Sequence, residues 1–274
     1  MDIDIRRGLG EAYMLAHQHW QPLLAYVALG VVVPFLLLSS EPIFNLRAIL
    51  AIIADPFTYR VSGSITGPLY LIGIVSVIVC GAMLAAWNAI LAEMREGYIS
   101  EIMYGMVAGA AYLVVNAIFY FGAGMILSIP ILLLGGFEDM ERFGLPFLIA
   151  RQILSALVSA WLSARFCLVG PLTAARGKLE PVSAFVESWR RTRTAWRRLF
   201  GLYLAIYVLT ALLTAALLAP HIFIVLSTPQ GGLADMAMSG GWLIFWAAYF
   251  LMVILIPAGL YRASERGAPA EVFA

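Results

Sequence analysis

Residues 69–91 have the sequence LYLIGIVSVIVCGAMLAAWNAIL, an uncharged apolar run of the length that a helix needs to cross a bilayer. A strand of a membrane barrel would alternate apolar and polar residues, and this run does not. The chain contains six such runs, at residues 22–38, 69–91, 108–134, 145–172, 199–220 and 242–261. They predict an all-α integral membrane protein with six transmembrane helices in a single domain of residues 1–274.

The composition excludes a water-soluble globular protein. Of 274 residues, 62% are hydrophobic and 12% are charged, against about 45–50% and about 25% in soluble domains. So few charges cannot cover the surface of a soluble protein of this size. The aromatic content and the mean hydropathy of +0.91 also exclude a disordered chain.

The basic residues predict the orientation of the helices. Thirteen Arg and Lys residues fall on one side of the six spans and four on the other, the four being Arg47, Arg60, Arg142 and Arg151. Because Lys and Arg are enriched in cytoplasmic loops, we expect both termini to lie in the cytoplasm. A cleaved signal peptide, the alternative for the first span, does not suit the acidic residues Asp2, Asp4 and Glu11 that precede it.

A basic amphipathic segment precedes the fifth span. In PVSAFVESWRRTRTAWRRLF (residues 181–200), apolar side chains recur at helical spacing and arginines cover the other face. Residues 181–198 therefore predict a helix that lies in the cytoplasmic interface and contacts anionic lipid. Its candidate contacts are Trp189, Arg190, Arg191, Arg193, Trp196, Arg197 and Arg198.

Weaker segments of the same kind precede two other spans, which suggests a repeat. Residues 3–19 predict an interfacial helix before the first span, and GYISEIMYGMVAGA precedes the third. Matching Ala12, Gly105 and Ser188 gives offsets of 93 and 83 residues, as expected for three parallel repeats of a two-span hairpin. The alternative is that any protein with an even number of spans shows this pattern under the same charge rule.

Arg151 and Arg165 lie fourteen residues apart within the fourth span. This spacing places them on nearly the same side of a helix. Both could bind an anion or a lipid phosphate, since ionisable groups inside a span are costly and often functional. The alternative is that each extends to the nearer headgroup layer. The carboxylates available to Arg165 are those of Glu93, Glu96 and Glu187.

Small and polar residues within the spans predict close helix packing. Ser155, Ser159 and Ser163 recur every fourth residue, and Gly105 and Gly109 form a G-x-x-x-G pattern. We expect Asn88 and Asn116 to hydrogen-bond across helices, with contact to a substrate as the alternative. His221 follows Pro220 near the outer end of the fifth span, where a role in proton transfer is the alternative to a structural one.

No catalytic motif is found. The chain lacks G-x-S-x-G, H-E-x-x-H, a P-loop and a dinucleotide-binding pattern. Cys80 and Cys167 lie inside spans, without the spacing of a metal site. We therefore expect no enzymatic activity, no catalytic residues, no metal site, no cofactor and no nucleic-acid partner.

Residues 165–204, RFCLVGPLTAARGKLEPVSAFVESWRRTRTAWRRLFGLYL, resemble the membrane domain associated with bacterial glycerophosphoryl diester phosphodiesterases and the related YciC-like six-span membrane proteins. The positions that carry the resemblance are Arg165, Pro171, Ser188, Trp189, Arg190, Thr192 and Arg193. The resemblance implies a six-helix membrane fold with interfacial helices. It does not imply phosphodiesterase activity, because the chain has no His-Arg dipeptide of the kind found in the catalytic domain.

Two functions remain open on the sequence. The first is a non-enzymatic protein of the bacterial inner membrane, a scaffold or accessory subunit that binds anionic lipid and either a partner protein or a second copy of itself. The second is a transporter or lipid-handling protein in which Arg165, Asn88 and Asn116 line a polar cavity. Convergence of these three side chains would favour the second.

Overall fold

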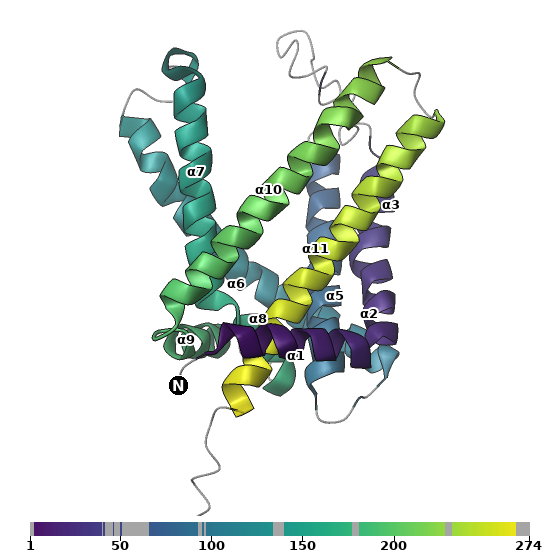
Figure 1. The fold of residues 1–274 in the computed structure, drawn as a ribbon, viewed down its shortest axis with the longest axis vertical. Helices are drawn as coiled ribbons and strands as arrows, with labels where there is room; N and C mark the ends of the chain where they lie inside the picture. Colours follow the sequence, from purple (N-terminus) through teal and green to yellow (C-terminus); the bar gives the residue numbers. More distant parts are fainter. Residues whose placement is uncertain are drawn as a thin grey trace, which may run out of the picture.

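The computed structural model describes residues 3–39, 66–92, 97–133, 140–176, 181–227 and 232–266, with residues 41, 46, 50 and 95. Within these ranges the regular structure is entirely helical (Figure 1). The helices are α1 (Ile5–Gln18), α2 (Trp20–Val27), the π-helical η1 (Ala28–Val32), α3 (Val33–Ser39), α5 (Thr66–Leu91), α6 (Tyr98–Leu133), α7 (Met140–Phe166), α8 (Val169–Arg176), α9 (Pro181–Arg191), α10 (Trp196–Ser227) and α11 (Leu233–Arg266).

Six of the described segments are long and apolar enough to cross a membrane. They are Trp20–Ser39, Tyr70–Leu91, Tyr98–Ile118, Ile153–Ala175, Trp196–Ser227 and Leu233–Glu265. Each overlaps one predicted span, which confirms the prediction of a helical, multi-pass membrane protein. The first is built from α2, η1 and α3 together.

The third span begins earlier than the sequence predicts. Residues 98–107 are the first turns of α6, not a separate interfacial helix. Gly97 has φ +101°, which a residue without Cβ adopts readily, and its carbonyl accepts the first bond of the helix from Glu101 N–H at 3.0 Å. The Glu101 carboxylate is paired with Arg95 and accepts a hydrogen bond from Tyr26. Its charge is therefore compensated, and the apolar helix can begin at this point.

The fourth span is broken where the sequence predicts continuity. Helix α7 ends at Phe166 and α8 begins at Val169. In a continuous helix the N–H of residue 171 would donate to the Cys167 carbonyl, but Pro171 has no N–H. The series of backbone hydrogen bonds is therefore interrupted at Cys167. By contrast, α10 continues past Pro220 to Ser227 and α11 continues past Pro257.

The basic segment 181–198 is not one helix. Helix α9 ends at Arg191, four residues form a turn, and α10 begins at Trp196. The Ser188 hydroxyl donates to the Arg165 carbonyl at 2.8 Å. The Thr192 hydroxyl lies 2.9 Å from the Ser188 carbonyl and 3.3 Å from the Arg165 carbonyl, and it can donate to either. This attachment to the end of α7 holds the corner at which the chain turns into the fifth span.

Helices α1 and α9 lie crosswise at the end of the bundle where α11 terminates (Figure 1). Helix α1 crosses α11 so closely that Gly259 lies against Gly8 and Ala12; a Cβ on Gly259 would be 2.6 Å from the Ala12 nitrogen. The buried core is concentrated toward this end, around Leu15, Trp87 and Ile254 in one cluster and Leu168, Phe185 and Leu199 in another.

Away from this end, α7 diverges from α10 and α11 (Figure 1). No residue of α10 from Gly201 to Pro220 is fully buried. Large apolar side chains such as Leu212, Phe223 and Ile244 are exposed there. An exposed apolar surface of this extent indicates contact with lipid or with another membrane helix.

Candidate functional site

The basic surface at the crosswise end is partly neutralised by one carboxylate. Glu187 pairs with Arg190 at 2.7 Å (Oε2 to Nη2) and with Arg191 at 2.7 Å (Oε1 to Nε), and Arg191 also reaches Glu265 at 3.5 Å. The hydrogen bonds and charges of Arg191 and Arg190 lower the pKa of Glu187. The side chains of Arg193, Arg197 and Arg198 are exposed on the same surface.

Arg165, at the end of α7, has an unusual environment. Its guanidinium lies over the ring of Trp189, 3.9 Å from the ring centre. The Nε and Nη1 atoms are buried and have no hydrogen-bond partner. The nearby charge that acts on it is that of Arg193, which has the same sign. A cation with buried, unused donors is costly, and an anion would remove that cost.

Aromatic rings hold Trp189 in place beneath this cation. Its ring packs against Trp161 at 5.6 Å and Phe166 at 5.8 Å between centres. Ser188 and Thr192 tie the same part of the chain to the Arg165 carbonyl. The site is therefore preorganised by α7 and α9 together. We call Arg165, Trp189 and Arg193 the arginine site.

Of the three carboxylates predicted to be available to Arg165, the structure describes only Glu187, which pairs with other arginines. Glu187 is engaged by Arg190 and Arg191. Glu93 and Glu96 lie outside the described residues, and Arg151 lies in α7 with no described side chain. Trp196 contacts Arg197, whose guanidinium is 5.6 Å from the ring centre.

The packing residues lie at helix contacts. Gly105 and Gly109 of α6 lie against α5, where a Cβ on Gly109 would be 2.8 Å from the Gly81 nitrogen. The Ser163 and Tyr207 hydroxyls join α7 to α10 at 3.2 Å. Ser159 and Ser155, which lie one and two turns before Ser163 on α7, are half-buried.

The two asparagines are separated in the structure. Asn88 donates from Nδ2 to the Ala174 carbonyl at 3.3 Å, which joins α5 to α8. Asn116 lines a cavity of about 250 Å³ between helices. Since neither Asn88 nor Arg165 lines this cavity, the three side chains do not converge.

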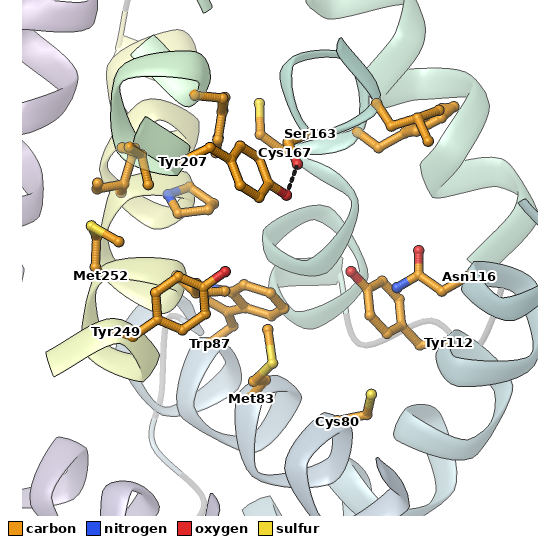
Figure 2. A pocket seen from close by; sticks show the side chains of 17 residues that line it. Cys80, Met83, Trp87, Tyr112, Asn116, Ser163, Cys167, Tyr207, Tyr249 and Met252 are labelled. Carbon is orange, nitrogen blue, oxygen red and sulfur yellow. Dashed lines mark hydrogen bonds between the residues drawn. The ribbon is translucent and has the colours of Figure 1, made fainter. Parts of the chain in front are cut away.

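The cavity is lined by residues of α5, α6, α7, α10 and α11. Figure 2 shows Tyr112 and Asn116 on one side, Tyr249 and Met252 on the other, and Cys80 and Met83 below. Tyrosines from α6, α10 and α11 thus surround a space within the membrane-spanning part of the chain. Sequence spacing could not identify it, because these residues come from separate spans.

His221 has partners that the sequence does not reveal. Trp242 donates from Nε1 to His221 Nδ1 at 2.8 Å, and His221 Nε2 lies 3.5 Å from Asp235 Oδ1. Both ring nitrogens therefore face groups of α11. This arrangement joins the last turns of α10 to the first turns of α11.

Sequence reasoning missed a buried ionic network. Glu101 has a fully buried side chain, pairs with Arg95 at 3.0 Å and accepts a hydrogen bond from the Tyr26 hydroxyl. The signal was an ionisable residue three positions into an otherwise apolar helix. The network joins α2 to the start of α6.

Among the residues that the structure describes, no group of three or more His, Cys, Asp and Glu side chains could hold a metal ion. The arrangement offers anion binding at the arginine site and a neutral, aromatic cavity inside the bundle. Comparisons of the chain with family models, with curated proteins and with solved structures gave no match.

Proposed function

We propose that this chain is a non-enzymatic protein of the bacterial inner membrane that binds anionic phospholipid at its cytoplasmic end and acts as a scaffold or accessory subunit. The observation that carries the proposal is the arginine site. Arg165 holds two buried, unpartnered nitrogens over Trp189, beside the charge of Arg193. A lipid phosphate supplies the negative charge and the acceptor oxygens that this site lacks.

The distribution of charge supports the proposed orientation. The arginines of α1 and α9, the start of α10 and the end of α11 belong to the end at which the crosswise helices lie (Figure 1). A cytoplasmic location for this end follows from the enrichment of basic residues in cytoplasmic loops. Both termini then lie on the cytoplasmic side.

The exposed side chains of the crosswise helices support an interfacial position. On α9, Val182 and Val186 are 65% and 66% exposed, close to Arg190. On α1, Tyr13 is exposed on the same helix as Arg6. An apolar exposed strip beside arginines is typical of a helix in the headgroup layer.

We also propose that the chain consists of three repeats and that it is related to the membrane domain it resembles. Helices α1 and α9 each lie crosswise before a span, as the repeat requires (Figure 1). The corresponding segment of the middle unit is continuous with α6. The corner held by Ser188, Thr192 and Arg165 involves residues that carry the resemblance to the membrane domain associated with phosphodiesterases.

A partner protein or a second copy would cover the exposed apolar part of α10. Cross-linking in membranes, followed by purification in mild detergent, tests this part of the proposal. We expect a complex larger than the monomer. A monomer that purifies without any other protein would contradict the scaffold role. It would not affect the proposed lipid site, which the following experiment tests separately.

The lipid site is tested with the purified protein in nanodiscs of phosphatidylcholine containing a small fraction of phosphatidylglycerol. Native mass spectrometry counts the phosphatidylglycerol that stays bound after release. We expect Arg165→Gln to weaken this binding about tenfold, the effect of losing a charge-assisted hydrogen bond. Arg6→Gln is the matched control, since Arg6 is exposed at the same end. Equal binding by both variants would refute the arginine site.

The cavity favours a second candidate function, that of a transporter or lipid-handling protein, because Asn116 and several tyrosines line it. Asn88 and Arg165 do not line the cavity, which counts against a continuous polar path formed by Arg165, Asn88 and Asn116. Transport of a labelled lipid between the leaflets of a proteoliposome would support this second function over the first.

A further inference from the structure

The cavity between α5, α6, α7, α10 and α11 has a lining of defined chemistry. Its volume of about 250 Å³ is far larger than the roughly 10–15 Å³ that a single water needs. This space is large enough for a ring or a length of hydrocarbon chain, and too small for a whole phospholipid. The occupant therefore inserts part of its structure between the helices.

The lining selects an uncharged occupant. Among the side chains that the structure describes, no Asp, Glu, Lys, Arg or His borders the cavity. Its polar groups are hydroxyls, thiols and the Asn116 amide, and the remaining surface is aromatic or aliphatic. A charged molecule would lose its hydration here without a counter-charge, whereas an apolar molecule would not.

One lining hydroxyl, that of Tyr203, has no strong hydrogen-bond partner among the described residues. The oxygen of Tyr203 is buried, and its polar neighbour is the Cys167 thiol, which is a weak hydrogen-bonding group. The nearby Tyr207 hydroxyl, by contrast, is satisfied by Ser163. Buried hydroxyls are normally paired, because desolvation without a partner is unfavourable. An occupant with an acceptor oxygen would satisfy Tyr203.

The occupant can reach the cavity from the bilayer. Tyr203, Tyr207 and Ile206 on α10 are only half-buried, and neighbouring Val208 is exposed to the surroundings of the helix. This part of α10 belongs to a membrane span. Molecules that enter beside it come from the lipid phase.

We propose that this cavity binds a neutral lipid, and that the Tyr203 hydroxyl donates a hydrogen bond to a carbonyl oxygen of that lipid. Two sources share this chemistry: the ester carbonyl of an acylglycerol and the ring carbonyl of a quinone. The proposal is independent of the arginine site, so its outcome is distinguishable from that of the phosphatidylglycerol experiment. Arg165→Gln should leave binding in the cavity unchanged.

The test uses the full chain in detergent and three probes: dioleoylglycerol, decylubiquinone and hexadecane, which has no carbonyl. Binding is measured by the shift of the thermal unfolding midpoint with probe concentration. We expect at least one carbonyl probe to bind the wild-type protein. Tyr203→Phe should weaken that binding about five- to tenfold and leave hexadecane unaffected. The probe whose affinity falls in Tyr203→Phe shows whether the bound carbonyl belongs to an acylglycerol or to a quinone.

Tyr203→Phe also has a distinctive effect on the empty protein. Removing a buried hydroxyl whose neighbour is a weakly bonding thiol should raise the unfolding midpoint without probe, whereas removing a strongly paired hydroxyl would lower it. Tyr13→Phe, at an exposed tyrosine, is the matched control and should change neither quantity. Cys80→Phe should fill the cavity and abolish probe binding. A lowered midpoint with unchanged affinity for both carbonyl probes in Tyr203→Phe would overturn the proposal.

Discussion

Replacing Gly105 by Ala should separate two helices that touch through their backbones. A Cβ on Gly105 would overlap the Gly81 carbonyl oxygen and lie 3.0 Å from the Ala85 Cβ and 3.1 Å from its nitrogen. These atoms belong to the rigid backbone of α5 or to its shortest side chains. The contact therefore cannot be relieved by turning a side chain, and the two helices must move apart.

The magnitude follows from two opposing terms. Overpacking of this kind costs about 1–3 kcal/mol, and the higher helix propensity of Ala returns about 0.5–1 kcal/mol. Gly122→Ala, on the same helix, is the control, because a Cβ there meets nothing within 4 Å. We expect Gly105→Ala to lower the free energy of unfolding by about 1–2 kcal/mol and Gly122→Ala to leave it unchanged or raise it.

The assay is reversible unfolding in mixed micelles, followed by circular dichroism as the fraction of sodium dodecyl sulfate rises. Wild type and both variants are compared under identical conditions. If Gly105→Ala proved as stable as Gly122→Ala, the close approach of α5 and α6 would be refuted, and with it the packing that places Cys80 and Met83 beside the cavity.

Two further predictions concern the ionisable groups at the crosswise end. Burial, together with the charges of Arg262 and Arg95, lowers the pKa of His19, so the unfolded chain binds more protons and stability should fall as pH drops below about 6.5. Unfolding midpoints between pH 7 and pH 5 should lose this dependence in His19→Gln and keep it in His17→Gln, since His17 is exposed; equal profiles would contradict the assignment. Arg95→Gln should cost about 3–5 kcal/mol, because it leaves the fully buried Glu101 carboxylate without its cation. Glu101→Gln should cost less, since Arg95 is 37% exposed and its charge can be rehydrated; the reverse order in unfolding measurements would show that the pair is not positioned as described.

Much of the fold is predictable because the bilayer restricts the choices. A continuous apolar run must be helical to satisfy its backbone, so spans such as residues 69–91 are evident from composition alone. The ends of helices are less evident. The corner at residues 192–195 depends on the Arg165 carbonyl, which comes from a distant part of the chain. The start of α6 depends on Arg95 and Tyr26 neutralising and binding Glu101.

The candidate sites divide in the same way. Arg165 and Trp189 stand out in the sequence as an intramembrane cation and an amphipathic aromatic residue. Their stacking was not predictable, because contact between them requires α7 and α9 to meet at one angle. The tyrosines of the cavity carry no sequence signal, since aromatic residues are common in spans and only the packing of five helices gathers these few around one space.

The sequence by itself determined that this chain is helical, that six of its segments are long and apolar enough to cross a membrane, and that its basic residues are concentrated between certain of these segments. Those properties follow from the hydrophobic thickness of the bilayer and the cost of charge within it, which act on each segment separately. Only the tertiary structure decided that Arg165 keeps unused donors over Trp189 and that Tyr203 has a hydroxyl without a strong partner in a cavity. Whether a polar group finds a partner depends on side chains from several helices, and their relative positions are set by packing.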